Sequence, residues 1–313
     1  MTAQASQLAD RPHVVIATPG RLADHIRSSP KEMGQVFRKC KFLVLDEADR
    51  LFSESYAKDL AVIMDVLPPP AERQTLLFTA TVTPHIRTLA EKPPSKGRKP
   101  VFIHELDSQE IAIPEKLDQR FLLVPGNVRE TYLFALLSHR DYKKSTCIIF
   151  VNTIYMAALL SRLLARLGIK NSALYSTLPQ SERISSLEKF RAGAVRVLVC
   201  TDVASRGLDI PEVDLVINFD IPRYPDDYIH RVGRTARAGR DGMSISFVSA
   251  NDVKLIEAIE ERVGSKMEEC TEIRDDTIVE ILKTVSEAKR KVALELPDKD
   301  EIKKRKRNYQ AIS

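Results

Sequence analysis

Three carboxylates stand within four residues at the end of an apolar run. The stretch from Lys41 to Arg50 reads KFLVLDEADR, and its acids are Asp46, Glu47 and Asp49. The pattern predicts a buried strand whose carboxyl end carries the acids, and in open α/β sheets ligands bind beyond such ends. A carboxylate there suits a hydrated Mg²⁺ ion, and a neighbouring one can orient an attacking water. An acidic helix start favoured by the helix dipole explains the same residues, so both interpretations stay open here.

Four arginines stand in the eleven residues from His230 to Arg240, HRVGRTARAGR. On a helix, the spacing of Arg231, Arg234 and Arg237 would let them line one broad side. Like charges this close repel one another unless a bound anion compensates them, and the guanidinium fork binds phosphate through paired hydrogen bonds. A solvated basic surface is the usual explanation of such a run. The small residues between the arginines allow a close approach, however, and favour an anion site.

A further polar segment, TDVASRGLD from Thr201 to Asp209, directly follows the apolar run VRVLVC. It carries hydroxyls, a glycine and carboxylates at a predicted strand end. Alone it would be an ordinary loop. Together with the arginine segment it indicates a second contact surface for phosphate and sugar.

Composition narrows the class of protein. A chain of 313 residues with 43% apolar residues is long enough for two domains. The four cysteines form no C-x-x-C pair, so disulfides and zinc are not expected and a reducing compartment fits best. The first ten residues have no basic start and no apolar stretch, so a secretory signal is not expected, and no apolar run approaches the roughly 18 residues of a membrane span. The net charge of +5 is only a weak indication of an anionic partner.

Short runs rich in Val, Ile, Leu and Phe alternate with helical periodicity, which predicts an α/β fold with parallel sheets covered by helices. In the first part we expect helices at residues 20–28 and 54–67 and strands at 12–19, 41–49, 74–81 and 100–104. In the second part we expect helices at 156–168 and 180–193, ended by Gly168 and Gly193, and strands at 119–124, 146–152, 171–176, 195–202, 213–220 and 243–249.

The domain boundaries follow from these patterns. We expect a partial first domain at residues 1–105, a linker rich in Pro and charge at 106–116, a complete second domain at 117–265, and a helical basic extension at 266–313. Apolar residues recur at helical spacing to about Leu296, which predicts a helix packed on the second domain. KKRKR, Lys303 to Arg307, is either a nuclear address or RNA-binding tail, or a solvated terminus.

Seven segments, in this order, resemble the motifs of DEAD-box RNA helicases. They are TPGR (Thr18 to Arg21), DEAD (Asp46 to Asp49), TAT (Thr79 to Thr81), IIFVNT (Ile148 to Thr153), QSER (Gln180 to Arg183), TDVASRGLD and HRVGRTAR. The resemblance covers roughly residues 11 to 250. Within the family, the chain looks most like nucleolar members that act on precursors of small-subunit ribosomal RNA.

The resemblance implies two RecA-like parallel-sheet domains, the first incomplete here, with ATP in the cleft between them. It implies that Asp46 holds Mg²⁺ through water and that Glu47 activates the hydrolytic water. Arg234 and Arg237 would reach the γ-phosphate, and Asp209 the ribose. Coupling between nucleotide and RNA would involve Asp49, Thr79, Thr81 and His230. Neither half would then be a complete active site.

RNA contacts are implied for both domains. They are Thr18, Gly20 and Arg21 in the first and Asn152, Gln180, Arg183, Thr201 and Gly207 in the second. Hydroxyls, amides, backbone N–H groups and a few arginines suit the sugar-phosphate backbone, and no aromatic stacking platform accompanies them. We therefore expect binding that does not depend on RNA sequence.

The sequence contains no G-x-x-x-x-G-K-[ST] segment, because none of its eleven glycines is followed by lysine. The adenine-reading glutamine segment and the PTREL-like motif of the family are also absent. In the family all three lie upstream of TPGR, so we expect a chain shortened at its front rather than degenerate in place. The strands ending at Asp46 and Thr81 would then lack a neighbour, and ATP hydrolysis by the chain alone would be poor.

Two functions remain in consideration. The first is an ATP-dependent RNA helicase that unwinds RNA duplexes or remodels ribonucleoproteins in ribosomal RNA processing, in the nucleus and specifically the nucleolus. Its partners would be RNA and protein activators or pre-ribosomal particles, without a membrane, and the chain would be a monomer. The second is a non-catalytic RNA-binding or regulatory helicase remnant. A DNA-directed relative of the same superfamily fits the motif spellings less well.

Overall fold

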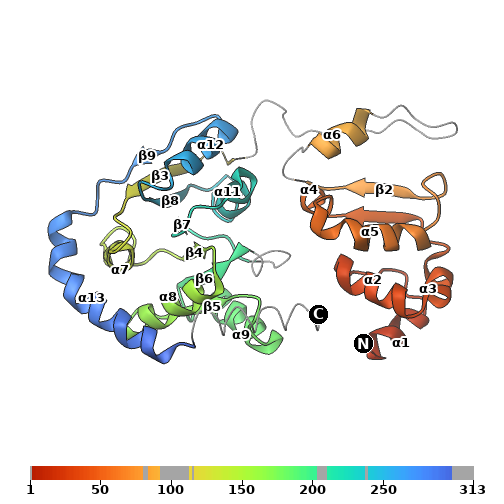
Figure 1. Ribbon diagram of the computed structural model, residues 1–313, viewed down its shortest axis with the longest axis horizontal. Coiled ribbons are helices and arrows are strands. Elements are labelled where there is room, and N and C mark those ends of the chain that lie inside the picture. Colours follow the sequence, from red (N-terminus) through yellow and green to blue (C-terminus); the bar gives the residue numbers. More distant parts are fainter. Residues whose placement is uncertain are drawn as a thin grey trace. The chain divides into compact units, whose positions relative to one another are not determined.

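The computed structural model describes residues 2–79, 84–91, 113–114, 116–202, 210–236 and 239–297. The chain forms two compact units, which we call unit 1 (residues 1–108) and unit 2 (residues 109–312). Each contains a parallel sheet with helices packed on it (Figure 1). Among the helices of the described ranges, none is long and apolar enough to cross a membrane.

Unit 2 is built on a seven-stranded parallel sheet in the order β5-β6-β4-β7-β8-β3-β9. The strands are β3 (Leu117–Leu123), β4 (Cys147–Val151), β5 (Asn171–Leu174), β6 (Val197–Thr201), β7 (Leu215–Asn218), β8 (Gly242–Val248) and β9 (Glu268–Glu269). Every residue of β4, β6 and β7 is buried, as continuous apolar runs predict for a parallel sheet covered on both faces. The six predicted strands of this half are confirmed. The short β9 was not predicted.

Helices cover both faces of this sheet. They are α7 (Arg129–Ser138), α8 (Ile154–Arg166), α9 (Gln180–Arg191), α11 (Pro225–Val232), α12 (Val253–Val263) and α13 (Asp275–Glu295). Cys147, Ile149 and Val151 of β4 join the apolar cluster of α7, α8 and α13. Ile148 and Phe150, on the opposite face, join the cluster of α9. The ends of α8 and α9 before Gly168 and Gly193 are confirmed, and both glycines have positive φ angles of 84° and 68°.

The helix predicted beyond residue 265 is α13, which packs against α7 and α8. Its buried residues Ile278, Val285 and Val292 recur at helical spacing. The ammonium of Lys289 lies 2.8 Å from Glu130 Oε1 of α7. The packing of this helix on the second half of the chain is therefore as predicted.

Unit 1 contains a two-stranded parallel sheet of β1 (Phe42–Leu45) and β2 (Gln74–Leu77). Its helices are α1 (Thr2–Ala9), α2 (Pro19–Ser28), α3 (Pro30–Phe37), α4 (Ala48–Leu51), α5 (Glu54–Val66) and α6 (Pro84–Glu91). Along β1, Leu45 is 6% exposed, whereas Phe42 and Val44 are 62% and 54% exposed. Because side chains alternate between the faces of a strand, one face of β1 packs inward and the other is exposed.

The strand predicted at residues 12–19 is wrong. Residues 11–18 form no strand, and the side chains of Val14 and Ile16 are 74% and 95% exposed. A strand requires a neighbour with which to exchange backbone hydrogen bonds, and the described sheet of unit 1 consists of β1 and β2 alone. The strand predicted at residues 100–104 lies outside the described residues, as does most of the predicted linker.

Two adjacent leucines of β3 test the burial pattern of unit 2. Leu122 is 5% exposed and Leu123 is 56% exposed. We expect Leu122→Ala to lower the free energy of unfolding by about 2–5 kcal/mol, because it removes core contacts and leaves a cavity. Leu123→Ala, the matched control, should change it by about 0.5 kcal/mol or less. Urea unfolding followed by circular dichroism measures both, and equal losses would contradict the assigned burial.

Candidate functional site

The acidic segment lies at the carboxyl end of β1, as predicted. Asp46 is exposed, and its Oδ1 accepts a hydrogen bond from the backbone N–H of Glu47 at 3.0 Å. Glu47 has a φ of 51°, a conformation that costs energy in a non-glycine residue and is concentrated at functional sites. The buried Ala48 donates its N–H to the carbonyl of Phe78, just beyond β2. These bonds fix the acids beside the end of β2, where Thr79 follows.

Asp46 fits the predicted Mg²⁺ ion. It is exposed, and the carboxylate engages a backbone N–H through one oxygen, which leaves lone pairs for the waters of a hydrated ion. Within the described ranges, no three His, Cys, Asp or Glu side chains form a group that could hold a metal ion. Asp49 is half-buried in α4, and Thr81 lies outside the described residues.

The predicted RNA contacts of unit 1 gather at the N-terminus of α2. Thr18 is exposed, has an extended backbone and precedes Pro19 at the first helical position. Gly20 and Arg21 follow in the first turn and are half-buried. The first N–H groups of a helix have no partner within it and form the positive end of its dipole, which suits a phosphate oxygen.

In unit 2, the buried guanidinium of Arg231 joins the carboxyl ends of three adjacent strands. Arg231 of α11 is 1% exposed. Its Nε and Nη2 donate to the two carboxylate oxygens of Asp202, after β6, at 2.7 and 2.8 Å. Nη2 also donates to Asn152 Oδ1, after β4, at 2.9 Å. Nη1 donates to Asn218 Oδ1, at the end of β7, at 3.3 Å and to the carbonyl of Asp220 at 2.6 Å.

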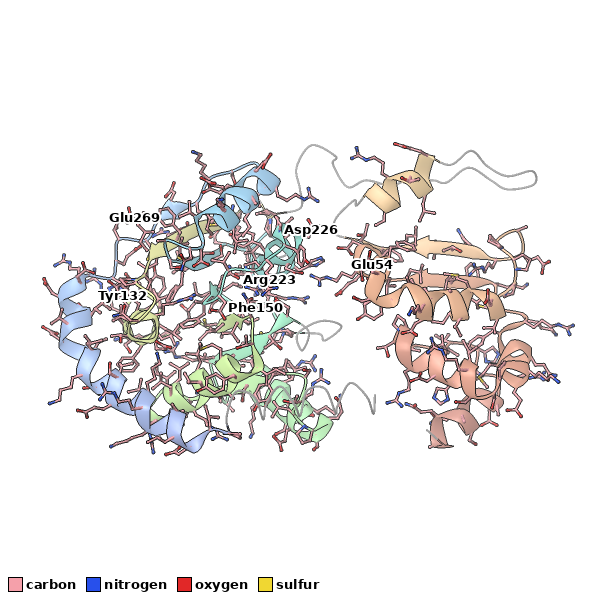
Figure 2. The ribbon with its side chains drawn as sticks, in the orientation of Figure 1. Glu54, Tyr132, Phe150, Arg223, Asp226 and Glu269 are labelled. Atoms are coloured by element: carbon pink, nitrogen blue, oxygen red, sulfur yellow. The ribbon has the colours of Figure 1, made fainter. Side chains whose placement is uncertain are left out.

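The prediction that Arg231 lines a basic surface with Arg234 and Arg237 is therefore wrong for Arg231. Its guanidinium carbon lies 5.2 Å from the ring centroid of Phe150, a core residue of β4 that Figure 2 shows within unit 2. Helical spacing would place these residues on one side of a helix, but α11 ends at Val232, before Arg234, and the polar strand ends beneath the helix draw the side chain of Arg231 inward. The sequence analysis missed its role. The polar residues Asn152, Asp202, Asn218 and Asp220, each at or just beyond the end of an apolar strand, were the available signal.

Asn152, a predicted RNA contact, is held on several sides. Its Nδ2 donates to the carbonyl of Ile221 at 2.9 Å, and its backbone N–H donates to Asp220 Oδ2 at 2.9 Å. Asp220 in turn lies 3.5 Å from Arg129, whose guanidinium stands over the ring of Phe219. Asn152 nevertheless remains exposed.

Two further predicted RNA contacts, Gln180 and Arg183, lie in the first turn of α9 and bond to each other. Arg183 Nη1 donates to Gln180 Oε1 at 3.0 Å. Gln180 is exposed and Arg183 is half-buried. No described residue accepts a hydrogen bond from Arg183 Nε. Thr201, at the end of β6, is 7% exposed, and Gly207 lies outside the described residues.

The segment after α11 is fixed by close backbone contacts. The buried hydroxyl of Thr235 donates to the carbonyl of Val213, and the N–H of Val213 donates to the carbonyl of Arg234. A Cβ on Gly242 would lie 2.4 Å from the backbone nitrogen of Ala236, so glycine is required there. His230 and Arg234 are both half-buried. Arg237 and Asp209 lie outside the described residues.

Family models match both units. Residues 1–89 match the DEAD/DEAH box helicase model and residues 129–239 the helicase conserved C-terminal domain. An ATP-dependent RNA helicase DBP8 of Scheffersomyces stipitis is 50% identical over 97% of this chain and 69% of its own length. That of Yarrowia lipolytica is 54% identical over 95% of this chain and 66% of its own.

Solved structures agree with the family models. Dbp5 of S. cerevisiae, bound to RNA and ADP BeF3, is 31% identical, with a TM-score of 0.70 over 87% of this chain and 69% of that chain. Mss116p, bound to ssRNA and AMP-PNP, is 28% identical, with a TM-score of 0.75 over 91% of this chain and 58% of that chain. The chain belongs to the DEAD-box family of ATP-dependent RNA helicases. The predicted α/β class with RecA-like parallel sheets is confirmed.

The cysteines give a test of the packing around the site. Burial raises the pKa of the thiols of Cys147 and Cys200, and it raises that of Cys270 to about 12. Cys40 is half-buried. Because the thiolate is the reactive form, we expect Ellman's reagent at about pH 8 to react rapidly with Cys40 and slowly with the other three.

Unfolding in urea should make all four thiols react, and Cys40→Ser should remove the rapid phase. Rapid labelling of Cys147 or Cys200 in the folded protein, located by peptide mapping, would contradict this packing.

Proposed function

We propose that the protein acts as an ATP-dependent RNA helicase that couples ATP hydrolysis to unwinding of RNA duplexes or remodelling of ribonucleoproteins. The observation that carries this proposal is the convergence of Asn152, Asp202 and Asp220 at the carboxyl ends of adjacent strands, around Arg231. Ligands of open α/β sheets bind at such an edge. The relatives bound to RNA and to nucleotide analogues support the same assignment.

RNA binding is the better supported half of this function. The contacts proposed in unit 2 are amides, hydroxyls and arginines, which recognise phosphate and sugar rather than base edges. The RNA contacts of unit 2 would be Asn152, Gln180, Arg183, Thr201 and Gly207. Those at the start of α2 would be Thr18, Gly20 and Arg21. The expected result is tight but sequence-independent binding that weakens with salt.

ATP hydrolysis would divide its chemistry between the two units. Asp46 would hold a hydrated Mg²⁺, which when bound neutralises charge on the phosphate oxygens. Glu47 would orient the attacking water and accept its proton. Arg234 and Arg237 would stabilise charge on the γ-phosphate, and Asp209 would bind the ribose. The coupling between the state of the nucleotide and RNA binding would involve Asp49, Thr79, Thr81 and His230.

The cellular role that fits best is ribosomal RNA processing in the nucleus, specifically the nucleolus. The support is the identity of about half of all residues with the helicases named DBP8. The Dbp5 structure bound to gle1 supports the expectation of protein partners, which we propose to be activators. Pre-ribosomal particles would be the site of action, and the chain itself would be a monomer.

One observation favours the second candidate, a non-catalytic RNA-binding or regulatory protein. None of the eleven glycines is followed by lysine, so this sequence holds no phosphate-binding loop of the G-x-x-x-x-G-K-[ST] type. A chain with this composition can retain the RNA surface of unit 2 without turning over ATP.

Arg183 provides a test of RNA binding. We expect Arg183→Gln to weaken binding of a labelled single-stranded RNA and to reduce the slope of log affinity against log salt by about 0.7, the effect of one lost phosphate contact. Arg191→Gln, an exposed arginine at the other end of α9, is the matched control and should leave the slope unchanged. Fluorescence anisotropy at several salt concentrations measures both. An unchanged slope in Arg183→Gln would remove this residue from the RNA surface.

Phosphate release tests catalysis. We expect the purified 313-residue chain to hydrolyse ATP very poorly, with or without RNA, because no backbone cradle and lysine hold the β- and γ-phosphates. Glu47→Gln is the control for contaminating activity and should not change the residual rate. Robust RNA-stimulated turnover that disappears in Glu47→Gln would refute this expectation and exclude the non-catalytic alternative.

A further inference from the structure

Arg231 has no hydrogen left for a ligand. A guanidinium carries five N–H donors, and the structure gives Arg231 five bonds: two to Asp202 and one each to Asn152, Asn218 and the carbonyl of Asp220. The side chain is 1% exposed. Arg231 therefore contacts neither RNA nor nucleotide directly, although it lies in the same basic segment as Arg234.

Each of two cations in this cluster lies beside an anion. Arg231 pairs with Asp202, and Arg129 pairs with Asp220 at 3.5 Å. Removing one member of such a buried pair would leave an uncompensated charge. The cluster consequently supplies geometry at the strand ends rather than a positive potential.

The bond from Arg231 fixes which way the amide of Asn152 points. Arginine has no acceptor, so only Oδ1 of Asn152 can face it, and Nδ2 must lie on the other side. One Nδ2 hydrogen goes to the carbonyl of Ile221 at 2.9 Å. Among the described residues, none accepts the second Nδ2 hydrogen, and Asn152 is exposed. The amide thus offers a donor to the outside, which selects a ligand with an acceptor oxygen.

The same guanidinium holds Asp202, the residue that directly follows β6. Asp202 receives two parallel bonds and stands next to Thr201, the last residue of the strand. Since β6, β4 and β7 are neighbours in the sheet, one side chain sets the spacing between the groups at three strand ends. A lysine offers three donors from a single point and cannot reproduce this set of bonds.

We propose that Arg231 is a positioning residue for RNA: it holds Asp202 at the end of the neighbouring strand and orients the Asn152 amide with its N–H outward, so that this amide meets an oxygen of an RNA backbone. This inference rests on the proposed RNA-binding function. Arg231 and Arg234 would then have different roles within one basic segment, because Arg231 acts through other residues and forms no phosphate contact.

The test measures affinity for a fluorescein-labelled oligouridylate by anisotropy, across a salt series, using the full chain. We expect Arg231→Lys to weaken binding about tenfold, the scale of one lost hydrogen bond to a charged group. The slope of log affinity against log salt should stay at the wild-type value, because no phosphate contact is lost. Arg223→Lys is the matched control, since Arg223 is an exposed arginine just before α11 (Figure 2) and should bind as wild type does.

Asn152→Asp decides the matter if Arg231→Lys fails to fold by circular dichroism. An aspartate keeps an acceptor for Arg231, but it presents an oxygen where the N–H stood, places an oxygen against the carbonyl of Ile221 and adds a negative charge. We expect a folded protein with a lower thermal midpoint and RNA binding at least tenfold weaker.

The outcomes separate the two proposals. Wild-type chain that binds no RNA would remove the proposed function and this inference with it. Wild-type chain that binds RNA, with a folded Arg231→Lys variant or Asn152→Asp of equal affinity, would overturn the inference alone. A salt slope reduced in Arg231→Lys would also overturn it, because it would show a direct phosphate contact.

Discussion

A buried guanidinium needs an acceptor for each of its N–H groups and an anion for its charge, and unit 2 is organised around meeting that need for Arg231. Its partners follow β4, β6 and β7, which are distant in sequence but adjacent in the sheet. Because parallel strands all point their carboxyl ends to one edge, a single helix can contact every one of these ends. The apolar strands supply the rigid frame, and Arg231 fixes the polar groups upon it.

In unit 1 the strands are partly exposed rather than buried. Parallel sheets are ordinarily covered on both faces, yet Phe42, Val44 and Phe78 are each more than half exposed at the two described strands. The acid segment is nevertheless fixed locally, through the bonds of Ala48 and Phe78 and the positive φ of Glu47. Local backbone geometry therefore survives where the apolar surface around it is exposed, so the acids keep their place at the strand end.

The sequence predicted those elements whose signal is contained in their own residues. The strands β4, β6 and β7 are continuous apolar runs, and buried parallel strands require nothing else to be recognised. The run at residues 12–19 has an apolar centre, residues 14–17, but no described neighbour to pair with, and pairing is a property of the sheet rather than of the run. The prediction that Arg231 lines a basic surface was wrong for a related reason. Helical spacing gives the position of a side chain along α11, whereas its inward direction depends on polar groups from three other segments.

A basic segment is not equivalent to a basic surface. Of the arginines between His230 and Arg240, Arg231 forms an ion pair with Asp202, whereas Arg234 is half-buried in the turn that follows α11. Arg129 and Asp220 form a second ion pair beside it, so a positive potential on unit 2 must come from residues outside these two pairs. Charge and geometry are in this way assigned to different arginines. A count of arginines in the sequence therefore overstates the positive potential of the site and understates how firmly its neutral donors are held.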